Sequence, residues 1–580
     1  MNRPLAKPPE RIRIGDLLMR EKIISESALK TALAEQRKTG HKLGRILIEL
    51  GLINEETLLD FLSRQLGIPL VDLKRYRFQP ETVRLLPESY ARRYRAIVLE
   101  DRSDDLLIGM VDPTDIFAYD ELSRLLKKPL QLSLVPEGDL IRAIDVVYRR
   151  TEEISLLAEE IGAELREGSN FDIEQLGQSE MLGEQPVVRL LKSLFEDAVQ
   201  ARTSDIHLEP EENQLRVRQR IDGILHEQLV EGRRVSQAII TRLKLMAGLD
   251  ISERRLPQDG RFSLKVKERT LDIRLATLPT SYGESVVMRL LDPSHDLIGL
   301  DQLGLPADLL PRLKTLIARP TGMVLVTGPT GGGKSTTLYS ILNAINHPAI
   351  KIITVEDPVE YRLPRISQIQ VNPRIGLDFA RILRTTLRQD PDVIMVGEIR
   401  DQETMEVALR AALMGHLVLS TLHTNDAPTG LDRLLNMGAR GYLIAATLNA
   451  VVSQRLIRRL CTDCTEIHEP TPQETAWLDS QGLSATDHEW RQGRGCPFCN
   501  NSGFRGRIGV FELLGIDAPL ADALRREVST DIAQTARRQA GYISLVRRAL
   551  GYAQGGLTSL SEVLRLFGEV NPFQEGPPNG

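Results

Sequence analysis

A glycine-rich stretch, GPTGGGKST at residues 328–336, constrains the fold of this 580-residue chain more than any other segment. The apolar run MVLVT precedes it, and a segment with apolar residues at helical spacing follows it. Together they match the strand–loop–helix pattern G-x-x-x-x-G-K-[ST], in which successive backbone N–H groups converge on phosphate oxygens. Glycines suit such a loop because no Cβ obstructs the phosphates. The stretch therefore predicts a nucleotide-binding α/β domain, and a glycine-rich surface turn is the weaker interpretation.

Within this loop we expect Lys334 to reach the β- and γ-phosphates of the nucleotide and Ser335 to ligate Mg²⁺. The N-terminus of the following helix adds positive potential. The predicted ATP-binding residues of the loop are Gly328, Pro329, Thr330, Gly331, Gly332, Gly333, Lys334, Ser335 and Thr336.

Three further apolar runs end in polar residues, as parallel strands do in a doubly wound sheet whose carboxyl ends carry functional groups. TVEDPVE places Glu356, Asp357 and Glu360 at one strand tip, and DVIMVGEIRD places Glu398 at another. From position alone, each glutamate could equally be a solvated loop residue. Beside a phosphate loop, a carboxylate can orient or deprotonate the attacking water, and we favour that interpretation.

The residue before Glu398 is Gly397, where an aspartate usually helps to hold the metal. Metal positioning must therefore rest more on Ser335, the phosphates and Glu398. A third apolar run, GHLVLSTLHTNDA, ends at His423. We interpret His423 as a sensor of the γ-phosphate, although a lone histidine is more often structural.

Changes of texture along the chain indicate several further regions. Residues 13–36 and 42–65 are two copies of a repeat, each with the pattern of two short helices, and Ser25 and Asn54 stand where the second helices should be N-capped. The expected divisions are 1–74 (tandem-repeat helical part), 75–150 (α+β part of the same N-terminal region), 151–184 (linker), 185–298 (α+β domain), 299–565 (nucleotide-binding domain, with a cysteine module at about 456–505) and 566–580 (disordered tail).

All four cysteines lie in two C-x-x-C pairs, Cys461 with Cys464 and Cys496 with Cys499, separated by 31 residues. Thiolates at this spacing can point at one ion, and a closed shell of four sulfurs is typical of structural zinc. The spacer is longer than in the commonest zinc ribbons. Free thiols or a redox pair are the alternatives to a zinc site.

Composition restricts the possible partners. The 74 basic and 79 acidic residues leave a net charge of −5, which offers no general attraction for nucleic acid and disfavours a DNA translocase. No apolar run approaches the roughly 18 residues that span a bilayer, and the N-terminal segment MNRPLAKPPERIRIG has no apolar core of a secretory signal. With few cysteines as well, we expect a cytoplasmic protein without a membrane span.

These blocks together resemble the secretion and pilus-assembly ATPases of the GspE and PilB group. GPTGGGKSTTLY is similar to their Walker A motif, TVEDPVEY to their aspartate box, DPDVIMVGEIRD to their atypical Walker B motif and GHLVLSTLHTNDA to their histidine box. RTSDIHLEP, VRQRIDGIL, RRLPQDGRF and DIRLATLPTSYGESVVMRLLD resemble the domain that precedes the ATPase domain in this group. The resemblance covers about residues 185–570.

The resemblance implies a multidomain α/β fold: a RecA-like ATPase domain with a zinc module, a PAS-like α+β domain before it, and an N-terminal regulatory region that is mainly helical plus α+β. It also implies a homohexamer that hydrolyses ATP with Mg²⁺ to assemble a type IV pilus or a type II secretion pseudopilus. Such a ring works at the inner membrane through a platform protein and other assembly components.

Roles for single residues follow from the same resemblance. It implies Glu360 as catalytic base, Glu398 as the Walker B glutamate and His423 as the sensing histidine, acting with Lys334. Three further positions match the arginine box, which reaches nucleotide phosphates across a domain or subunit seam: Arg261, Arg274 and Arg289. Salt bridges on exposed strands are the alternative for these arginines.

The N-terminal repeat resembles the MshEN domain of MSHA-type pilus ATPases, in which two tandem motifs bind cyclic di-GMP. The implied contacts are Arg13, Ile14, Gly15, Leu17, Leu18, Gln36, Lys42, Leu43, Gly44, Leu47 and Gln65. Three positions depart from the pattern: Lys22 replaces a glycine, Lys42 an arginine and Phe61 an alanine. Lysine supplies charge but not the planar guanidinium. A helical docking module for a membrane-platform protein is the alternative.

Two other functions compete with the assembly motor. A pilus-retraction motor is disfavoured by the cysteine module and the long N-terminal region. A nucleotide-binding scaffold, or a cyclic di-GMP receptor with little hydrolysis, is disfavoured because the predicted catalytic residues are intact: Lys334, Ser335, Glu360, Glu398 and His423.

Overall fold

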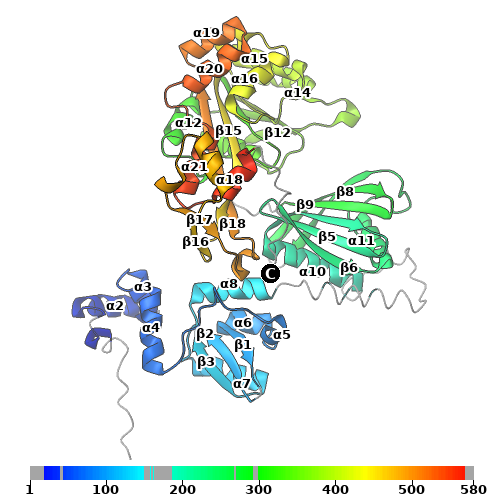
Figure 1. Ribbon diagram of the computed structural model, residues 1–580. Coiled ribbons are helices and arrows are strands. Elements are labelled where there is room, and N and C mark those ends of the chain that lie inside the picture. The colour runs from blue at the N-terminus through cyan, green and yellow to red at the C-terminus, as the bar shows by residue number, and fades with distance from the viewer. Residues whose placement is uncertain are drawn as a thin grey trace, which may run out of the picture. The chain divides into compact units, whose positions relative to one another are not determined.

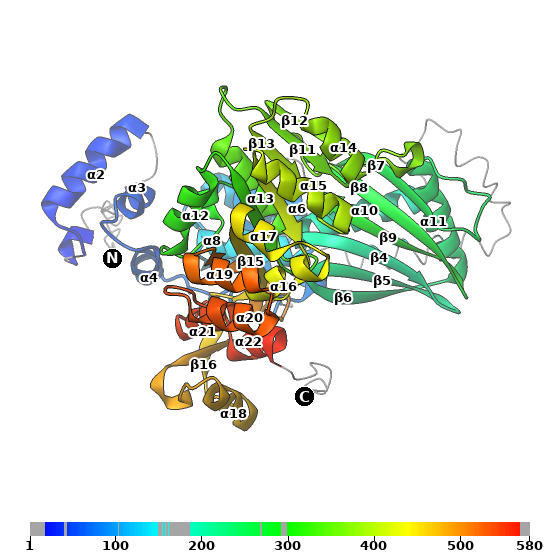
Figure 2. The same cartoon turned by 90° about the horizontal axis from the view of Figure 1, so that it is seen from above.

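The computed structural model describes residues 18–21, 23–39, 43–102, 104–148, 154, 157, 161, 186–266, 269–291 and 298–568. The chain divides into two compact units, residues 1–149 with 496–501, and residues 150–495 with 502–580 (Figures 1 and 2). Across the described ranges, no helix combines the length and the apolar character needed to cross a membrane.

The first unit begins with helices α2 (Glu26–Thr39), α3 (Leu43–Glu49) and α4 (Glu55–Leu66). Both predicted N-caps are confirmed: the amide of Ala28 donates to Ser25 Oγ at 3.2 Å, and that of Thr57 donates to Asn54 Oδ1 at 2.7 Å. The apolar faces of these helices meet in one small core that includes Phe61.

The α+β part of this unit is a three-stranded sheet in the order β1-β2-β3, with β1 antiparallel and β3 parallel to β2. A bridge between Leu70 and Leu134 joins the segment after α4 to the edge strand β3. The elements are α5 (Pro80–Val83), α6 (Glu88–Tyr94), β1 (Ala96–Asp101), β2 (Leu106–Met110), α7 (Ile116–Leu126), β3 (Leu130–Leu134) and α8 (Glu137–Val147).

The second unit contains a six-stranded antiparallel sheet in the order β6-β5-β4-β9-β8-β7 (Figure 2). Its strands alternate buried and exposed residues, as expected for a sheet with one covered face. The elements are α10 (Pro186–Ala201), β4 (Thr203–Pro210), β5 (Gln214–Ile221), β6 (Ile224–Glu231), α11 (Arg233–Met246), β7 (Gln258–Val266), β8 (Arg269–Thr280) and β9 (Gly283–Leu291).

Both helices of this domain contribute to its core, and so do three residues of the expected linker. Ile154, Leu157 and Ile161 are helical and buried among the same apolar side chains as α10 and α11. The described part of 151–184 is therefore packed, whereas its other residues lie outside the described ranges.

A seven-stranded sheet follows in the order β12-β11-β13-β14-β10-β15-β18, parallel except for the last strand, β18. Every residue of β10, β11, β13 and β14 is buried, because helices cover both faces. One core joins α12 and α13 to the sheet. A second core joins six further helices to it: α14, α15, α16, α17, α19 and α20. In Figures 1 and 2, α12 and α14 lie on opposite sides of β15. The predicted doubly wound α/β sheet is confirmed.

The bounds of this domain's elements are α12 (Leu309–Ile317), β10 (Gly322–Thr327), α13 (Lys334–Ile345), β11 (Ile352–Glu356), β12 (Ile366–Gln370), α14 (Phe379–Thr386), β13 (Val393–Val396), α15 (Gln402–Leu413), β14 (Leu417–Leu422), α16 (Ala427–Asn436), α17 (Gly441–Thr447), β15 (Leu448–Leu460), β18 (Phe504–Gly515), α19 (Ala518–Arg526), α20 (Ser529–Arg538), α21 (Leu545–Gln554) and α22 (Leu560–Phe567).

The cysteine-containing insert between β15 and β18 carries a small hairpin, β16 (Thr465–His468) with β17 (Trp490–Gly493), and helix α18 (Pro472–Ser480). At the end of the chain, α22 continues to Phe567, two residues into the expected tail, because Val563 and Leu564 bury its apolar face. Residues 569–580 of that tail lie outside the described ranges.

Candidate functional site

The phosphate loop connects β10 to α13 and depends on glycine conformations. Gly328, Gly331 and Gly333 have φ values of +147°, +75° and +87°, in the region that side chains rarely adopt. A Cβ at Gly328 would also overlap the carbonyl oxygen of Gln454, whereas a Cβ at Gly331 would meet no atom within 4 Å. The loop is therefore pressed against β15 at its first glycine and open at the middle one.

Lys334 is the first residue of α13 and is buried. Its ammonium group donates to the carbonyl oxygens of Gly328 at 3.0 Å and Pro329 at 2.9 Å. Burial lowers the pKa of Lys334, and the nearby carboxylate of Glu398 opposes that shift. The neighbouring Ser335 and Thr336 are exposed, so their side chains are open to a ligand.

Gln454 on β15 braces this loop, although no motif marks it in the sequence. Its amide nitrogen donates to the carbonyl oxygen of Gly332 at 2.6 Å, and its amide oxygen accepts from Thr337 Oγ1 at 2.7 Å. The side chain is buried. Only the pairing of β15 with β10 brings these residues together, 122 positions apart in the chain.

The tips of β10, β14 and β13 are neighbours in the sheet, and they bring Lys334, His423 and Glu398 into a row. His423 Nδ1 lies 3.5 Å from Lys334 Nζ, and His423 Nε2 lies 3.4 Å from Glu398 Oε2. An ammonium can only donate, which assigns Nδ1 as the acceptor and Nε2–H as the donor to Glu398. The row continues to Arg400, whose guanidinium donates to the other oxygen of Glu398.

The charge of Glu398 follows from these neighbours. Burial alone would raise the pKa of this carboxyl group, but Arg400 and then His423 outweigh that effect, and the pKa lies below its usual value. Glu398 therefore stays ionised at neutral pH beside the phosphate loop. Arg400 also lies 3.7 Å from Asp357 at the tip of β11, so it links two acidic strand ends. Sequence reasoning missed Arg400, although it stands only two residues after Glu398.

The two glutamates of TVEDPVE have different environments. Glu356, at the end of β11, is 4% exposed and points into the protein, where it accepts from Thr354 Oγ1 at 2.6 Å. Glu360 lies on the loop that follows and keeps an open side. Its carboxylate forms an ion pair at 2.9 Å with Arg274 of the six-stranded sheet.

The three predicted arginines form one row across that sheet. Arg274 on β8 is directly opposite Arg261 on β7 and Arg289 on β9. Like charges at opposite positions repel, and two of the three are compensated: Arg274 by Glu360, and Arg289 by Asp205 at 3.0 Å. In the described part of the chain, Arg261 is exposed and has no such carboxylate partner.

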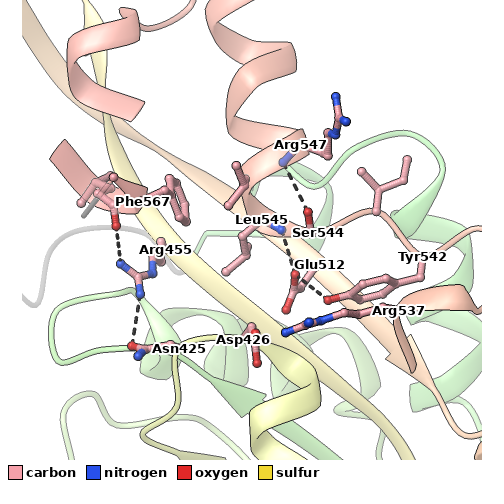
Figure 3. A pocket seen from close by; sticks show the side chains of 14 residues that line it. Asn425, Asp426, Arg455, Glu512, Arg537, Tyr542, Ser544, Leu545, Arg547 and Phe567 are labelled. Atoms are coloured by element: carbon pink, nitrogen blue, oxygen red, sulfur yellow. Dashed lines mark hydrogen bonds between the residues drawn. The ribbon is translucent and has the colours of Figure 1, made fainter. Parts of the chain in front are cut away.

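Beyond His423, the same loop borders a separate cavity of about 790 Å³ (Figure 3). Asn425 lines it and accepts from Arg455 at 3.2 Å. Glu512 is buried there and accepts from the amides of Ala427 and Leu545 and, at 3.0 Å, from the hydroxyl of Tyr542. Burial raises the pKa of Glu512 despite these donors. None of the predicted site residues lines this cavity.

The four cysteine sulfurs lie within 4.8 Å of one another, and all four residues are buried. The sulfurs of Cys496 and Cys499 are 3.7 Å apart, close to the edge of about 3.8 Å in a tetrahedron with Zn–S bonds of about 2.3 Å. The amide of Cys496 donates to the sulfur of Cys499 at 3.2 Å, which suits a thiolate. The cluster therefore fits a tetrahedral metal with four sulfur ligands.

The predicted cyclic di-GMP contacts divide into two groups. Arg13, Ile14, Gly15, Leu17 and Lys42 lie outside the described residues.

The described members are mostly part of the helical core. Leu18 and Leu47 are fully buried, whereas Leu43, Gly44 and Gln36 are half-buried. Gln65 is exposed and donates to Glu21 at 3.2 Å.

Comparison with known proteins finds family matches for most of the chain. A family model described as Type II/IV secretion system protein matches residues 180–565, and a model described as MshEN domain matches residues 66–154, which follow the tandem repeat. The type IV pilus assembly ATPase PilB of Myxococcus xanthus is 41% identical over 564 residues, which are 95% of this chain and 98% of that protein.

Two further matches cover smaller shares of the chain. The type II secretion system ATPase E of Vibrio cholerae is 41% identical over 497 residues, covering 84% of this chain and 98% of its own length. A solved structure of MshE with cdg is 43% identical and covers 24% of this chain and 100% of its own, with a TM-score of 0.23.

Proposed function

The chain belongs to the Type II/IV secretion system protein family and is an ATPase of that family, and we propose that it hydrolyses ATP to power assembly of a type IV pilus or a type II secretion pseudopilus. The observation that carries this proposal is the row formed by Lys334, His423 and Glu398 at adjacent strand tips beside the phosphate loop. A scaffold that only bound nucleotide would have no use for an ionised carboxylate held there by Arg400.

In the proposed reaction, the loop amides and Lys334 hold the β- and γ-phosphates. Bound Mg²⁺, ligated by Ser335, would neutralise charge on the phosphates. Glu360 accepts the proton of the water that attacks the γ-phosphate while ADP leaves, and Glu398 would help to hold the bound Mg²⁺. His423, which donates to Glu398 and accepts from Lys334, is placed to respond when Lys334 turns from the loop carbonyls to the γ-phosphate.

We further propose that the arginine row acts across a seam in a homohexamer. Arg261, the uncompensated member, is available for a phosphate, because a guanidinium stays charged and binds phosphate with paired N–H groups. Arg274 and Arg289 hold their carboxylates until nucleotide or a neighbouring subunit competes for them. Differences between ATP-bound and ADP-bound seams would then move subunits in the ring.

The four-cysteine cluster is proposed to bind structural Zn²⁺. The sulfur geometry and the burial of the four residues support a closed site, in which zinc would supply folding energy to the insert and take no part in hydrolysis.

The N-terminal repeat, with the adjoining region that the MshEN model matches, is proposed to bind cyclic di-GMP and to regulate the motor. We expect the protein to be cytoplasmic, with no nucleic-acid partner, and to reach the inner membrane through a platform protein and other assembly components. Leu18 and Leu47 would need to leave the helical core to contact the ligand directly, so their first role is packing.

Phosphate release by the purified full-length protein tests the proposal. We expect Mg²⁺-dependent ATP turnover that falls at least about 100-fold in Lys334→Ala and in Glu360→Gln, because one removes phosphate binding and the other the base. Cyclic di-GMP should change turnover of the unmodified protein and leave Arg13→Ala unaffected. Nucleotide binding without turnover, at protein concentrations where the ring forms, would favour the scaffold instead.

A further inference from the structure

Tyr339 lies on α13, the helix that begins with Lys334, and it is 2% exposed. Its hydroxyl group has partners on two sides. It donates to the carboxylate of Glu356 and accepts from the backbone amide of Glu360 at 3.2 Å. One buried phenol therefore joins the phosphate-loop helix, the end of β11 and the loop that carries Glu360.

The Glu356 carboxylate is a fixed point of this network because several hydrogen bonds hold it. Besides Tyr339 and Thr354, it accepts from Gln368 Nε2 at 3.1 Å, and it is almost fully buried. A buried carboxylate with three donors is costly to disturb, because each lost partner leaves desolvated charge uncompensated.

Gln368 extends the network to the rest of the loop. Its Nε2 also donates to the carbonyl oxygen of Tyr361 at 2.9 Å, and its Oε1 accepts from the amide of Leu363 at 2.7 Å. The loop backbone is thus fixed at residues 360, 361 and 363 by the buried side chain of Tyr339 and the half-buried side chain of Gln368. Neither side chain forms a hydrogen bond with the Glu360 carboxylate, which pairs with Arg274.

We propose that Tyr339 is a positioning residue for Glu360 and transmits the position of the phosphate-loop helix to it. A hydrogen bond to the amide of Glu360 fixes the main chain from which the carboxylate projects, and misplacement of a reacting group by about 1 Å can cost on the order of 100-fold in rate. Since Lys334 and Tyr339 share one helix, any movement of that helix would also move the Glu360 amide. This inference rests on the proposed role of Glu360 as base.

If Tyr339 had only a structural role, the packing of its ring would matter and its hydroxyl group would not. The ring of Tyr339 packs edge-on against Tyr361, with centroids 5.7 Å apart and an interplanar angle of 86°. Phenylalanine would preserve that contact and remove only the hydroxyl group. Tyr339→Phe therefore separates packing from positioning.

The test measures ATP hydrolysis by the full-length protein. We expect Tyr339→Phe to lower kcat about tenfold while KM for ATP stays within about twofold, because the binding loop is intact and only the base is displaced. The matched control is Tyr542→Phe, which removes a hydroxyl group that donates to another buried carboxylate, Glu512, in the same domain (Figure 3). The control should change kcat less than about twofold.

A double-mutant cycle with Glu360→Gln separates this inference from the function on which it rests. If Tyr339 acts through Glu360, Tyr339→Phe has no further effect on kcat in the Glu360→Gln background. If the phenylalanine lowers kcat by the same factor in both backgrounds, the positioning role is overturned even though Glu360 is essential. Full turnover by Glu360→Gln alone would refute the proposed base instead.

A second variant tests the inference if Tyr339→Phe does not fold. If Tyr339→Phe fails to bind a fluorescent ATP analogue, Gln368→Asn is measured in the same cycle, because it loosens the loop from β12 without touching α13. A fall in kcat that disappears in the Glu360→Gln background supports the network, and unchanged kcat in Gln368→Asn overturns it.

Discussion

The phosphate loop and the acidic edge of the same sheet are built in different ways. The loop is formed by nine consecutive residues, and three of its glycines have positive φ values. The acidic edge consists of side chains from three separate strand tips, and an arginine of another domain holds its outermost member, Glu360. The first is built mainly from residues adjacent in the chain, with Gln454 of β15 as a distant brace, whereas the second exists only when the sheet is assembled.

The charged side chains of the two regions also have different surroundings. Lys334 lies among carbonyl groups, and burial lowers its pKa. Glu398 is also partly buried, but discrete cations outweigh the burial and its pKa falls. Substitutions in the loop should therefore disturb ligand binding, and substitutions at the edge should disturb proton transfer or its pH dependence.

The largest effect is expected from Gly328→Ala compared with Gly331→Ala. The added methyl group at 328 meets the backbone of Gln454, which cannot move without breaking the sheet, so a cost of roughly 3 kcal/mol or about 100-fold in ATP affinity is expected. At 331 the methyl group finds open space, and only the positive φ costs roughly 1–2 kcal/mol. Titration with a fluorescent ATP analogue measures both affinities.

Thermal unfolding of the two variants supplies the control, since a lower unfolding temperature in Gly328→Ala alone would point to general damage of β15. Equal loss of ATP affinity in both variants would contradict a loop whose shape is set by contact with Gln454.

This difference between the regions also explains what the sequence could predict. The phosphate loop, its strand and helix, the acidic strand tips and two helix caps were predicted because each depends on residues close together in the chain. The distant partners were missed: Gln454 braces a glycine 122 residues away in the phosphate loop, and Tyr339 reaches a carboxylate 17 residues away because α13 packs on the sheet. No periodicity carries that information, because it arises from the order of strands in the sheet.

The arginine row could be predicted only in part from the sequence. The sequence resemblance singled out Arg261, Arg274 and Arg289, but only the antiparallel register shows that they are directly opposite one another. Their compensation by Asp205 and Glu360 depends on contacts about 84 to 86 residues away. The roles of single members of the row thus become separable only in the structure.

An intermediate effect is expected when the row is dissected. Arg274→Ala should lower kcat about tenfold with little change in ATP affinity, because Glu360 loses the ion pair that orients it. Arg261→Ala should instead weaken ATP binding by roughly tenfold, the value of one charge-assisted contact. Steady-state kinetics at varied ATP concentration separates the two. A pure loss of affinity in Arg274→Ala would mean that this arginine acts on the nucleotide and does not orient Glu360.

The smallest effect concerns pH and tests whether the edge depends on discrete charges. Arg400 lowers the pKa of Glu398 against the upward effect of burial, so Arg400→Ala should raise that pKa. A carboxyl group with a raised pKa is protonated at higher pH as the solution is acidified, so the acidic limb of the kcat profile should move upward and the alkaline limb should stay in place. Because Arg400 is 60% exposed and screened by solvent, we expect kcat near pH 6 to fall only about threefold, and less at high salt.

Arg410→Ala is the control: it removes a surface arginine 3.5 Å from Glu406 and should leave the pH profile of kcat unchanged. An acidic limb that does not move in Arg400→Ala would mean that a group other than Glu398 controls it.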